Sequence, residues 1–385
     1  MYKFGLSNLL TNIKLNYLIN LLKLIFYFLK NQNAKYPQYL IKFEKKISTK
    51  FKFKFCLTFS NGTSAAESIF KSLNVFNKNV VVSKLTFPSI ICALLRNGAK
   101  LYYLDIDRNL QLIINKKEEI LKSSEILILT NTFGFMHNKT NIEKIKNINK
   151  DIQIIEDMSH SQGASTENTF SGKHGVASFM SMQGNKAISA GEGGIAFTDS
   201  LDLYKKMIIY SHINRTDKSF DETTNNLIKI GLGSKARMNP LGVFRADFDL
   251  DNLNNRNNKI RIIAKLIYEK LNKNKKITSP LVTSYDELGG FHYGIPFFIS
   301  KNIISEEIIK EYKIQRYNWP ALDKSNYFQS YDNFKKIKLK DANINNLFNN
   351  YEDLRDDLFF FDLKFIIKLK KNKLNTLIDN FLNAV

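Results

Sequence analysis

The amino-acid sequence predicts an α/β protein built around a mostly parallel β-sheet. The first observation is a series of short apolar runs between residues 53 and 198, each of a length that suits one buried strand. The second is that segments with helical spacing of apolar side chains separate several of these runs. Because parallel strands need long crossover connections, which helices usually supply, this alternation is typical of βαβ units.

The expected elements of this sheet follow one another along the first half of the chain. Strands are expected at residues 53–60, 80–83, 101–107, 125–134, 151–157, 175–182 and 193–198. Helices are expected at residues 36–50, 65–73, 89–98, 141–149 and 201–213. Pro88 and Gly98 bound one of these helices, because proline suits the first helical turn and glycine suits the end of a helix.

The C-terminal part has a less regular order and is expected to form a smaller α+β unit. The irregular segment 214–237 is predicted to be a loop. Beyond it we expect a polar helix, a strand, a charged helix, a proline-broken loop and a last helix, at residues 250–271, 291–300, 304–314, 317–324 and 372–385. A length of 385 residues is enough for two domains. The predicted division is an N-terminal amphipathic helix (1–35), a large domain (36–249) and a small C-terminal domain (250–385).

Composition excludes several classes of protein. The chain has 57 Lys+Arg against 36 Asp+Glu, a formal net charge of +21. These basic residues are spread along the whole chain among many Asn and Ile residues, so we attribute them to compositional bias and expect no nucleic-acid partner. Cys56 and Cys92 lie far apart in apolar segments, which indicates reduced thiols and no disulfide. The five histidines show no metal-ligand spacing, and no metal site is expected.

The N-terminal segment is strongly apolar over residues 15–29. Lys23 interrupts the run, which leaves it shorter than the 18 or so residues that read as a membrane span. A basic amphipathic helix of this kind could lie on an anionic membrane surface, or pack on the protein or a second subunit. We favour packing, because amphipathic helices usually face a protein core. No small-residue cleavage site follows the run, so no signal peptide is expected and the predicted location is the cytoplasm.

A candidate site lies in the stretch from residue 154 to residue 194. A buried strand ends there in two carboxylates, Glu156 and Asp157. Lys186 follows in a polar loop, just before a cluster of glycines. Taken singly, Lys186 reads as a surface lysine in a lysine-rich chain and Asp157 as a strand-end carboxylate. Their pairing in one stretch favours a functional site over these ordinary roles.

A second part of the site is expected at the Asn-Gly-Thr-Ser turn of residues 61–64. This turn joins a strand to a helix, and Ser64 and Glu67 have the spacing of a capping box. The N–H groups at a helix N-terminus bind anions, although the turn alone is more simply an ordinary helix cap. Ligands of parallel sheets bind at the carboxyl ends of the strands, so the turn is expected to lie near the candidate site.

These features are the ones that pyridoxal phosphate (PLP) needs. A lysine forms the Schiff base with the cofactor, a carboxylate keeps the pyridine nitrogen protonated, and a helix N-terminus holds the phosphate. Asp157 would raise the pKa of the ring nitrogen, because a nearby negative charge favours the protonated form. Lys186, once an amine donor displaces it, would be free to move a proton as a general base.

Five segments, in this order, resemble the DegT/DnrJ/StrS family of PLP-dependent sugar aminotransferases. They are NGTSAAES, TFPSIICALLRNGAKLYYLDID, IIEDMSHSQGA, FMSMQGNKAISAGEGGIAFTD and KARMNPLG. The resemblance runs from about residue 36 to residue 255 and continues more weakly to the C-terminus. It implies the aspartate-aminotransferase fold (fold type I), with a sheet of the seven-stranded type, and a homodimer with active sites at the subunit interface.

The resemblance also assigns roles to individual residues. The matched cofactor positions are Gly62, Thr63, Ser64, Phe87, Asp157, His160, Ser181, Lys186 and Lys235. Among them, Lys186 matches the lysine bonded to the cofactor and Asp157 the partner of the pyridine nitrogen, and these two are the expected catalytic residues. His160 matches a contact of the cofactor's 3-hydroxyl, and Phe87 a residue that stacks on the ring. The Gly62–Ser64 turn and Ser181 match the phosphate cradle.

Several positions depart from the family's pattern. Gln183-Gly184-Asn185 precedes the lysine, where many members have a Tyr or Pro-Thr sequence. Lys235 stands where many members have an asparagine that reaches the partner's phosphate, and a lysine would act there as a point charge. Gln162 stands where histidine is frequent. Arg215 and Arg237 could bind a carboxylate or phosphate of the substrate, or pair with a local acid.

The expected function is transfer of an amino group from glutamate or glutamine to a keto sugar, expected to be nucleotide-linked, in amino-sugar and polysaccharide biosynthesis. Alternatives are a keto cyclitol as acceptor, an enzyme of the same fold that eliminates, and a non-catalytic binding or regulatory relative. The retained Lys186 argues against the family's dehydratase branch, in which histidine replaces the lysine. No other partner than these small molecules and a second subunit is favoured.

Overall fold

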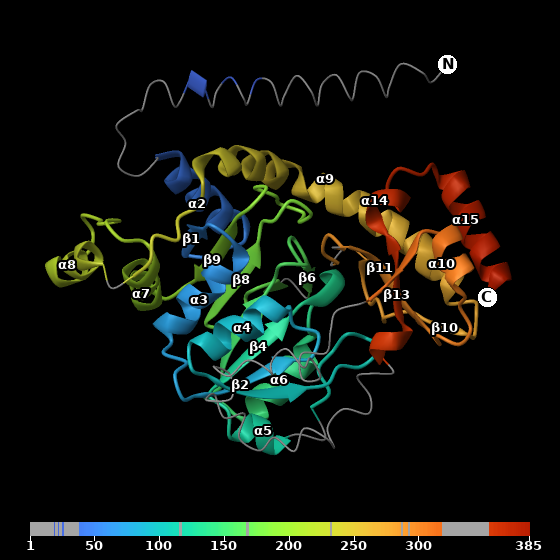
Figure 1. The fold of residues 1–385 in the computed structure, drawn as a ribbon, viewed down its shortest axis with the longest axis horizontal. Helices are drawn as coiled ribbons and strands as arrows, with labels where there is room; N and C mark the ends of the chain where they lie inside the picture. Colours follow the sequence, from blue (N-terminus) through green and yellow to red (C-terminus); the bar gives the residue numbers. More distant parts are fainter. Residues whose placement is uncertain are drawn as a thin grey trace.

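The computed structural model describes residues 19, 22, 25, 26, 38–114, 118–166, 169–231, 233–285, 288–291, 293–317 and 354–385. It confirms an α/β fold with a mostly parallel central sheet (Figure 1). Seven strands lie in the order β1-β9-β8-β5-β4-β2-β3. Their bounds are β1 (Phe55–Phe59), β2 (Asn79–Ser83), β3 (Lys100–Leu104), β4 (Ile126–Thr130), β5 (Gln153–Asp157), β8 (Ala177–Ser181) and β9 (Gly194–Thr198). Only β9 runs antiparallel to its neighbours, β1 and β8, among the described strand pairs of this sheet.

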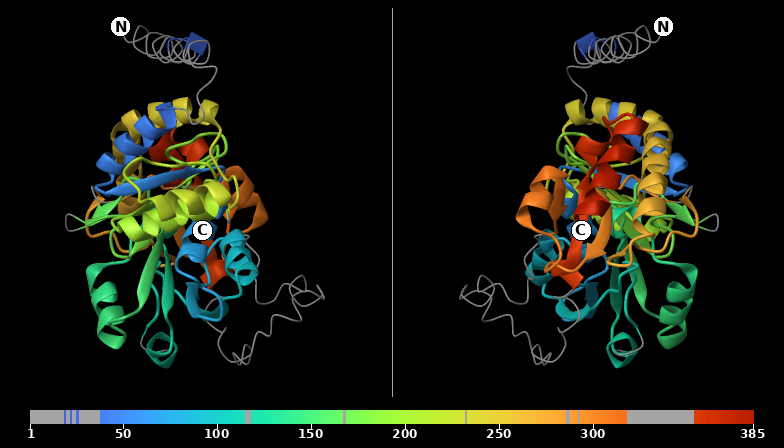
Figure 2. Two further views of the ribbon diagram at one scale, coloured as in Figure 1. Left: turned by 90° about the vertical axis from the view of Figure 1, so that its left-hand side faces the viewer. Right: turned by 90° about the vertical axis from the view of Figure 1, so that its right-hand side faces the viewer.

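Helices cover both faces of this sheet (Figure 2), because its strands are apolar on both sides. In β4, Ile126 and Ile128 face one core while Leu127 and Leu129 face the other. The first core is closed by α3 (Gly62–Ser72), α4 (Pro88–Arg96) and α7 (Leu201–Ser211). The opposite face is covered by α2 (Gln38–Lys50), α6 (Lys139–Ile148) and α9 (Pro240–Leu271), with α5 (Glu118–Lys122) against α6.

A second, four-stranded antiparallel sheet lies in the C-terminal region, in the order β10-β11-β13-β12. Its strands are β10 (Ile277–Thr278), β11 (Gly294–Ile299), β12 (Ile314–Arg316) and β13 (Leu358–Asp362). The helices around it are α10 (Glu306–Glu311), α14 (Leu363–Ile366) and α15 (Lys371–Ala384). Helix α9 has 32 residues and joins the two regions without a break (Figure 1). The predicted boundary between residues 249 and 250 lies inside this helix, and the division into domains stays a prediction.

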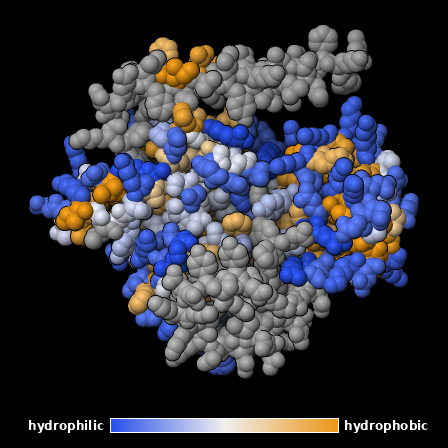
Figure 3. Space-filling view, in the orientation of Figure 1, coloured by the Kyte–Doolittle hydropathy of each residue, from blue (hydrophilic) through white to orange (hydrophobic). Residues whose placement is uncertain are grey.

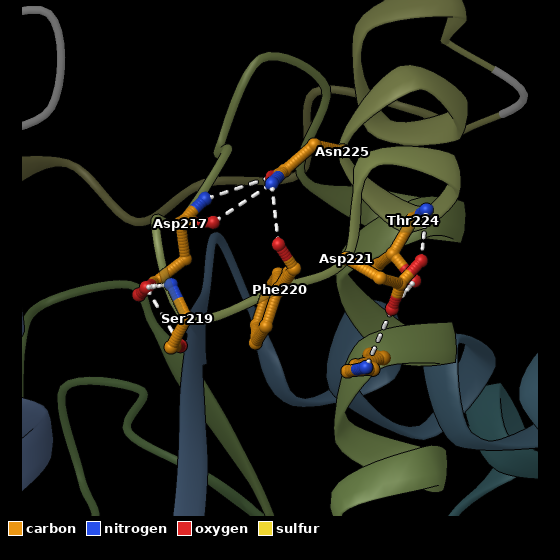
Figure 4. A network of polar contacts seen from close by, with 7 residues as sticks. Asp217, Ser219, Phe220, Asp221, Thr224 and Asn225 are labelled. Atoms are coloured by element: carbon orange, nitrogen blue, oxygen red, sulfur yellow. Dashed lines mark hydrogen bonds and ion pairs between the residues drawn. The ribbon is translucent and has the colours of Figure 1, made fainter.

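The segment predicted as a loop between residues 214 and 237 contains a helix, α8 (Glu222–Ile230). Its start is fixed by polar contacts that short-range periodicity does not reveal (Figure 4). The Asp221 side chain accepts a hydrogen bond from Thr224 N at 2.8 Å, and the Asn225 amide donates to the backbone of Asp217 and Phe220. These contacts supply the helix cap, so the prediction of a loop was wrong here.

Two helix starts also differ from expectation. Helix α9 begins at Pro240, not near Leu250, because Asn239 caps it and proline suits its first turn. Helix α3 is capped by Asn61, whose side chain accepts from Ser64 N at 2.8 Å, so Ser64 is not the cap. The Glu67 carboxylate instead pairs with Arg96. Strand β13 was not predicted, although its Phe-rich sequence is typical of a buried strand.

Some predictions fall outside the described residues. The N-terminal helix of residues 1–35 does so except at four positions, and the proline-broken loop at 317–324 does so after Tyr317. No helix in the described ranges combines the length and the apolar content that crossing a membrane requires. On the face drawn in Figure 3, hydrophilic groups extend over both the large sheet's helices and the C-terminal region.

Candidate active site

A cavity of about 230 Å³ opens at the carboxyl ends of β4, β5 and β8. Its described lining consists of Asn61, Gly62, Thr63, Leu85, Phe87, Ser89, Ile90, Thr130, Asn131, Asp157, Ser159, His160, Phe179, Ser181, Gln183, Lys186, Glu192 and Tyr293. The cavity therefore brings together seven of the nine residues that the sequence predicted. Ser64 and Lys235 are not among the described lining residues.

Asp157 is the last residue of β5, paired with Thr130 of β4 and Phe179 of β8. This register places its carboxyl group at the floor of the cavity, where it is only 5% exposed. Ser159 N donates to Asp157 Oδ1 at 2.9 Å and fixes the orientation of the group. Burial raises the pKa of Asp157 above its ordinary value, although the bonds from Ser159 and the charge of Lys186 act in the opposite direction.

Lys186 lies in the loop between β8 and β9, and Gln162 holds this loop in place. The buried Gln162 side chain donates from Nε2 to Ser181 O and accepts at Oε1 from Ile188 N, each at 2.7 Å. The Lys186 N–H donates to Gln183 O at 2.9 Å and closes a tight turn. Burial lowers the pKa of Lys186 to about 8, and the Asp157 charge opposes part of this effect. Gln162, which the sequence marked only as a departure, is thus a positioning residue of the lysine loop.

The N-terminus of α3 forms another wall of the cavity. Asn61 already accepts from Ser64 N and Ala65 N, which leaves the N–H groups of Gly62 and Thr63 at the start of the helix. A Cβ atom on Gly62 would lie 2.8 Å from Ser181 Cβ, so only glycine fits at this close approach. Helix N-termini with hydroxyl groups nearby are sites for phosphate.

Hydroxyl groups and aromatic rings complete the lining. Thr63 Oγ1 and Ser89 Oγ are 2.8 Å apart, beside the start of α3. Phe87 lies on the rim and is 45% exposed. The ring of His160 meets the ring of Tyr293 edge to face, with centroids 5.3 Å apart. Tyr293 was not predicted as a site residue, because it comes from the distant C-terminal region and lies in a segment whose pattern indicates only a strand.

Glu156, the first carboxylate of the predicted pair, points to the other side of β5. It is fully buried and accepts from Asn131 Nδ2 at 3.0 Å and from Gly172 N at 3.1 Å. Burial acts to raise its pKa, but the hydrogen bonds and charge of His174 outweigh it and lower the pKa below the ordinary value. Glu156 is thus a structural anion that orients Asn131, one of the lining residues of the cavity.

The two arginines considered as substrate ligands make contacts within the protein. Arg215 pairs with the buried Glu44, with Nη1 3.1 Å from Oε1. Arg237 donates to the carbonyl of Ile213. Of the two readings open for Arg215, pairing with a local acid is the one observed. Lys235 is exposed and lies in a short β-bridge with His212. Its contact with the phosphate of a second subunit stays a prediction.

The donor set of the cavity fits PLP. A carboxylate and a lysine with a lowered pKa lie around one cavity, and a glycine-tipped helix N-terminus offers free N–H groups to an anion. An exposed aromatic ring, Phe87, is available to cover a flat ligand. The placement of these residues against the cofactor stays a prediction.

Comparison with known proteins identifies the family. The profile of the DegT/DnrJ/EryC1/StrS aminotransferase family matches residues 23–343. UDP-4-amino-4,6-dideoxy-N-acetyl-beta-L-altrosamine transaminase of Campylobacter jejuni is 25% identical over 314 residues, which are 77% of this chain and 82% of the relative. GDP-perosamine synthase of Escherichia coli O157:H7 is 26% identical over 173 residues, 44% of this chain and 47% of the relative. The match with GDP-perosamine synthase therefore spans about half the length of that relative.

Solved structures show the same fold at low identity. A DegT DnrJ EryC1 StrS aminotransferase from Brucella abortus superimposes with a TM-score of 0.76 at 15% identity, covering 100% of this chain and 99% of that one. The E. coli GDP-4-keto-6-deoxy-D-mannose-3-dehydratase with bound hydrated PLP gives 0.73 at 19% identity, covering 94% and 95%. The predicted resemblance is confirmed. The chain therefore belongs to the DegT/DnrJ/EryC1/StrS aminotransferase family, a family of PLP-dependent enzymes.

Proposed function

We propose that the protein transfers an amino group from glutamate or glutamine to a nucleotide-linked keto sugar, in the biosynthesis of amino sugars for polysaccharide. One observation carries the proposal: Asp157, at the end of β5, and Lys186, in the loop after β8, line the same cavity as the glycine-tipped start of α3. The C. jejuni and E. coli relatives are, by name, a UDP-amino-sugar transaminase and a GDP-perosamine synthase, which supports a nucleotide sugar as substrate.

The residues of the chain have separate tasks in this proposal. Bound PLP supplies an electron sink for the carbanion formed at the α-carbon of the amine donor. Asp157 keeps the pyridine nitrogen protonated through its negative charge. Gly62 and Thr63 hold the phosphate through their N–H groups, with the Thr63 hydroxyl beside them. His160 and Phe87 orient the ring, and Lys235 would reach the phosphate of a second subunit in a homodimer.

Lys186 moves the proton. With a pKa of about 8, the Lys186 side chain would be unprotonated in roughly a tenth of the molecules at pH 7, against less than about a thousandth for an ordinary lysine. General bases work best when their pKa lies near the working pH. Gln162 holds the backbone of the loop that carries Lys186.

The same lysine separates this proposal from elimination. The fold that this chain shares with the E. coli GDP-4-keto-6-deoxy-D-mannose-3-dehydratase makes dehydration the competing function. Lys186 stands at the position where, by the resemblance, the dehydratase branch of the family has histidine. A lysine can bond to PLP again after each half-reaction, which transamination requires.

The test is a reaction of the PLP-loaded protein with glutamate, glutamine and a panel of nucleotide-linked keto sugars, with a keto cyclitol included. Amination of one acceptor, with 2-oxoglutarate formed in equal amount from glutamate, is the expected result. Asp157→Asn should retain PLP but slow the single-turnover reaction with glutamate severely, because the ring nitrogen loses its proton. Loss of water from the sugar without net amination would favour the dehydratase, and an unchanged Asp157→Asn rate would exclude the role given to that residue.

A further inference from the structure

Three aromatic residues near the cavity have left-handed backbone conformations. They are Phe133 (φ 54°), Phe291 (φ 43°) and Tyr293 (φ 70°). Bulky residues avoid this region because the Cβ atom crowds the backbone, and they persist there only when the surrounding structure holds them. Of the three, Tyr293 is the one that lines the cavity itself.

The backbone of Tyr293 is held by the C-terminal sheet. Leu363 N donates to Tyr293 O at 2.9 Å. The next residue, Gly294, pairs with Asp362 in β13, and a Cβ atom there would come within 2.0 Å of Phe361 O. Tyr293 therefore stands at a fixed point directly before β11, and it lines a cavity whose other described lining residues come from the large sheet and its connections.

The ring of Tyr293 touches the groups that the proposed reaction uses. Lys186 Nζ lies over the ring at 5.8 Å from its centroid, within the range of a cation–π contact. The edge-to-face contact with His160 has an interplanar angle of 88°. Phe133 and Phe360 pack on the ring at centroid distances of 6.4 and 6.2 Å. Packing from several sides fixes the ring while the lysine side chain keeps four rotatable bonds.

We propose that Tyr293 is a positioning residue, whose ring face holds the Lys186 ammonium group whenever that nitrogen is not bonded to the cofactor. The inference deepens the proposed function and rests on it. The C-terminal region thereby sets where the reactive nitrogen lies, and the negative charge of Asp157 attracts the same ammonium group. A cation–π contact favours the protonated amine, so it opposes the effect of burial on Lys186.

The test uses cofactor-free protein and measures how the rate of amine labelling at Lys186 depends on pH. Acetic anhydride serves as the reagent, and peptide mass spectrometry reads out each lysine. Tyr293→Leu should move the midpoint for Lys186 down by about 0.5 to 1 pH unit, as expected for the loss of a cation–π contact. Tyr293→Phe keeps the ring and should leave the midpoint at the wild-type value. Tyr285→Leu, in the same region but away from the cavity, is the matched control.

A second variant covers the case in which Tyr293→Leu does not fold. Tyr293→Asn removes the ring with a residue that tolerates the left-handed backbone, and it should move the midpoint in the same direction. An unchanged midpoint in the ringless variants, or an equal change in Tyr293→Phe or Tyr285→Leu, overturns the proposal. The assay needs neither cofactor nor substrate, so its failure is separate from a failure to transaminate.

Discussion

Replacing Lys186 by methionine should stabilise the cofactor-free protein at neutral pH. Methionine has a similar length and carries no charge, so the variant removes a partly buried ammonium group without leaving a large cavity. The folded-state pKa of about 8 lies below the 10.5 of an ordinary lysine. At about 1.4 kcal/mol per pH unit, this difference corresponds to at most about 3 to 4 kcal/mol of free energy that burial costs the charged form. The variant should gain about 1 to 3 kcal/mol at pH 7.

The effect depends on pH in a defined direction. Between pH 8 and 10.5 the unfolded chain binds more protons at this position than the folded chain, so the stability contributed by Lys186 rises with pH. Below pH 8 both states are protonated and the full cost is present. The advantage of Lys186→Met over wild type should therefore be largest at pH 7 and shrink steadily towards pH 10.5.

Urea unfolding of both cofactor-free proteins at pH 7, 9 and 10 measures this difference. Lys229→Met, at an exposed position of α8, is the control for loss of one surface charge and should show no comparable gain. A Lys186→Met protein that is less stable than wild type at pH 7, or a difference that does not change with pH, would refute the account of a desolvated lysine.

Three further substitutions test the framework of the site. Gly62→Ala should weaken PLP binding measured by absorbance titration and cost about 1 to 3 kcal/mol of stability, because its Cβ would lie 2.8 Å from Ser181 Cβ. Gln162→Ala should lower the free energy of unfolding by about 2 to 4 kcal/mol, since two backbone groups of the lysine loop lose their hydrogen-bond partner. A smaller loss of stability than in Gly62→Ala would argue against the role of Gln162 in holding this loop. Arg215→Met should lower the free energy of unfolding by about 3 to 5 kcal/mol, because it leaves the buried carboxylate of Glu44 without its cationic partner. A change in the KM for substrate with no loss of stability would instead support Arg215 as a substrate ligand.

The sequence predicted those parts of the site that depend on local pattern and on the direction of the strands. Asp157 ends a strand whose apolar run is plain in the sequence, and parallel strands end at one edge of a sheet, so its approach to the turn of Gly62 could be foreseen. The resemblance to a family then placed Lys186 on the same cavity. These predictions depend on the positions of residues in the sequence and need no distances between atoms.

Contacts between distant segments could not be read in the same way. Tyr293 lines the cavity from the position directly before β11. Its left-handed backbone lies next to the pairing of Gly294 with β13 and accepts a hydrogen bond from Leu363 N, contacts that no local pattern expresses. Arg215 meets Glu44 across 171 positions of sequence, so the choice between a substrate ligand and a structural pair needed the fold. Helix α8 was missed because its cap depends on side-chain contacts of Asp221 and Asn225 and not on apolar spacing.

The most direct test of the central claim is to locate the lysine that binds PLP. The protein is saturated with PLP, reduced with borohydride to fix the cofactor on its lysine, digested and analysed by peptide mass spectrometry. The account predicts one stoichiometric label, on Lys186, together with a visible absorbance band that Lys186→Ala lacks while the protein stays folded. A principal label on another of the chain's many lysines, or no label under saturating cofactor, would contradict it.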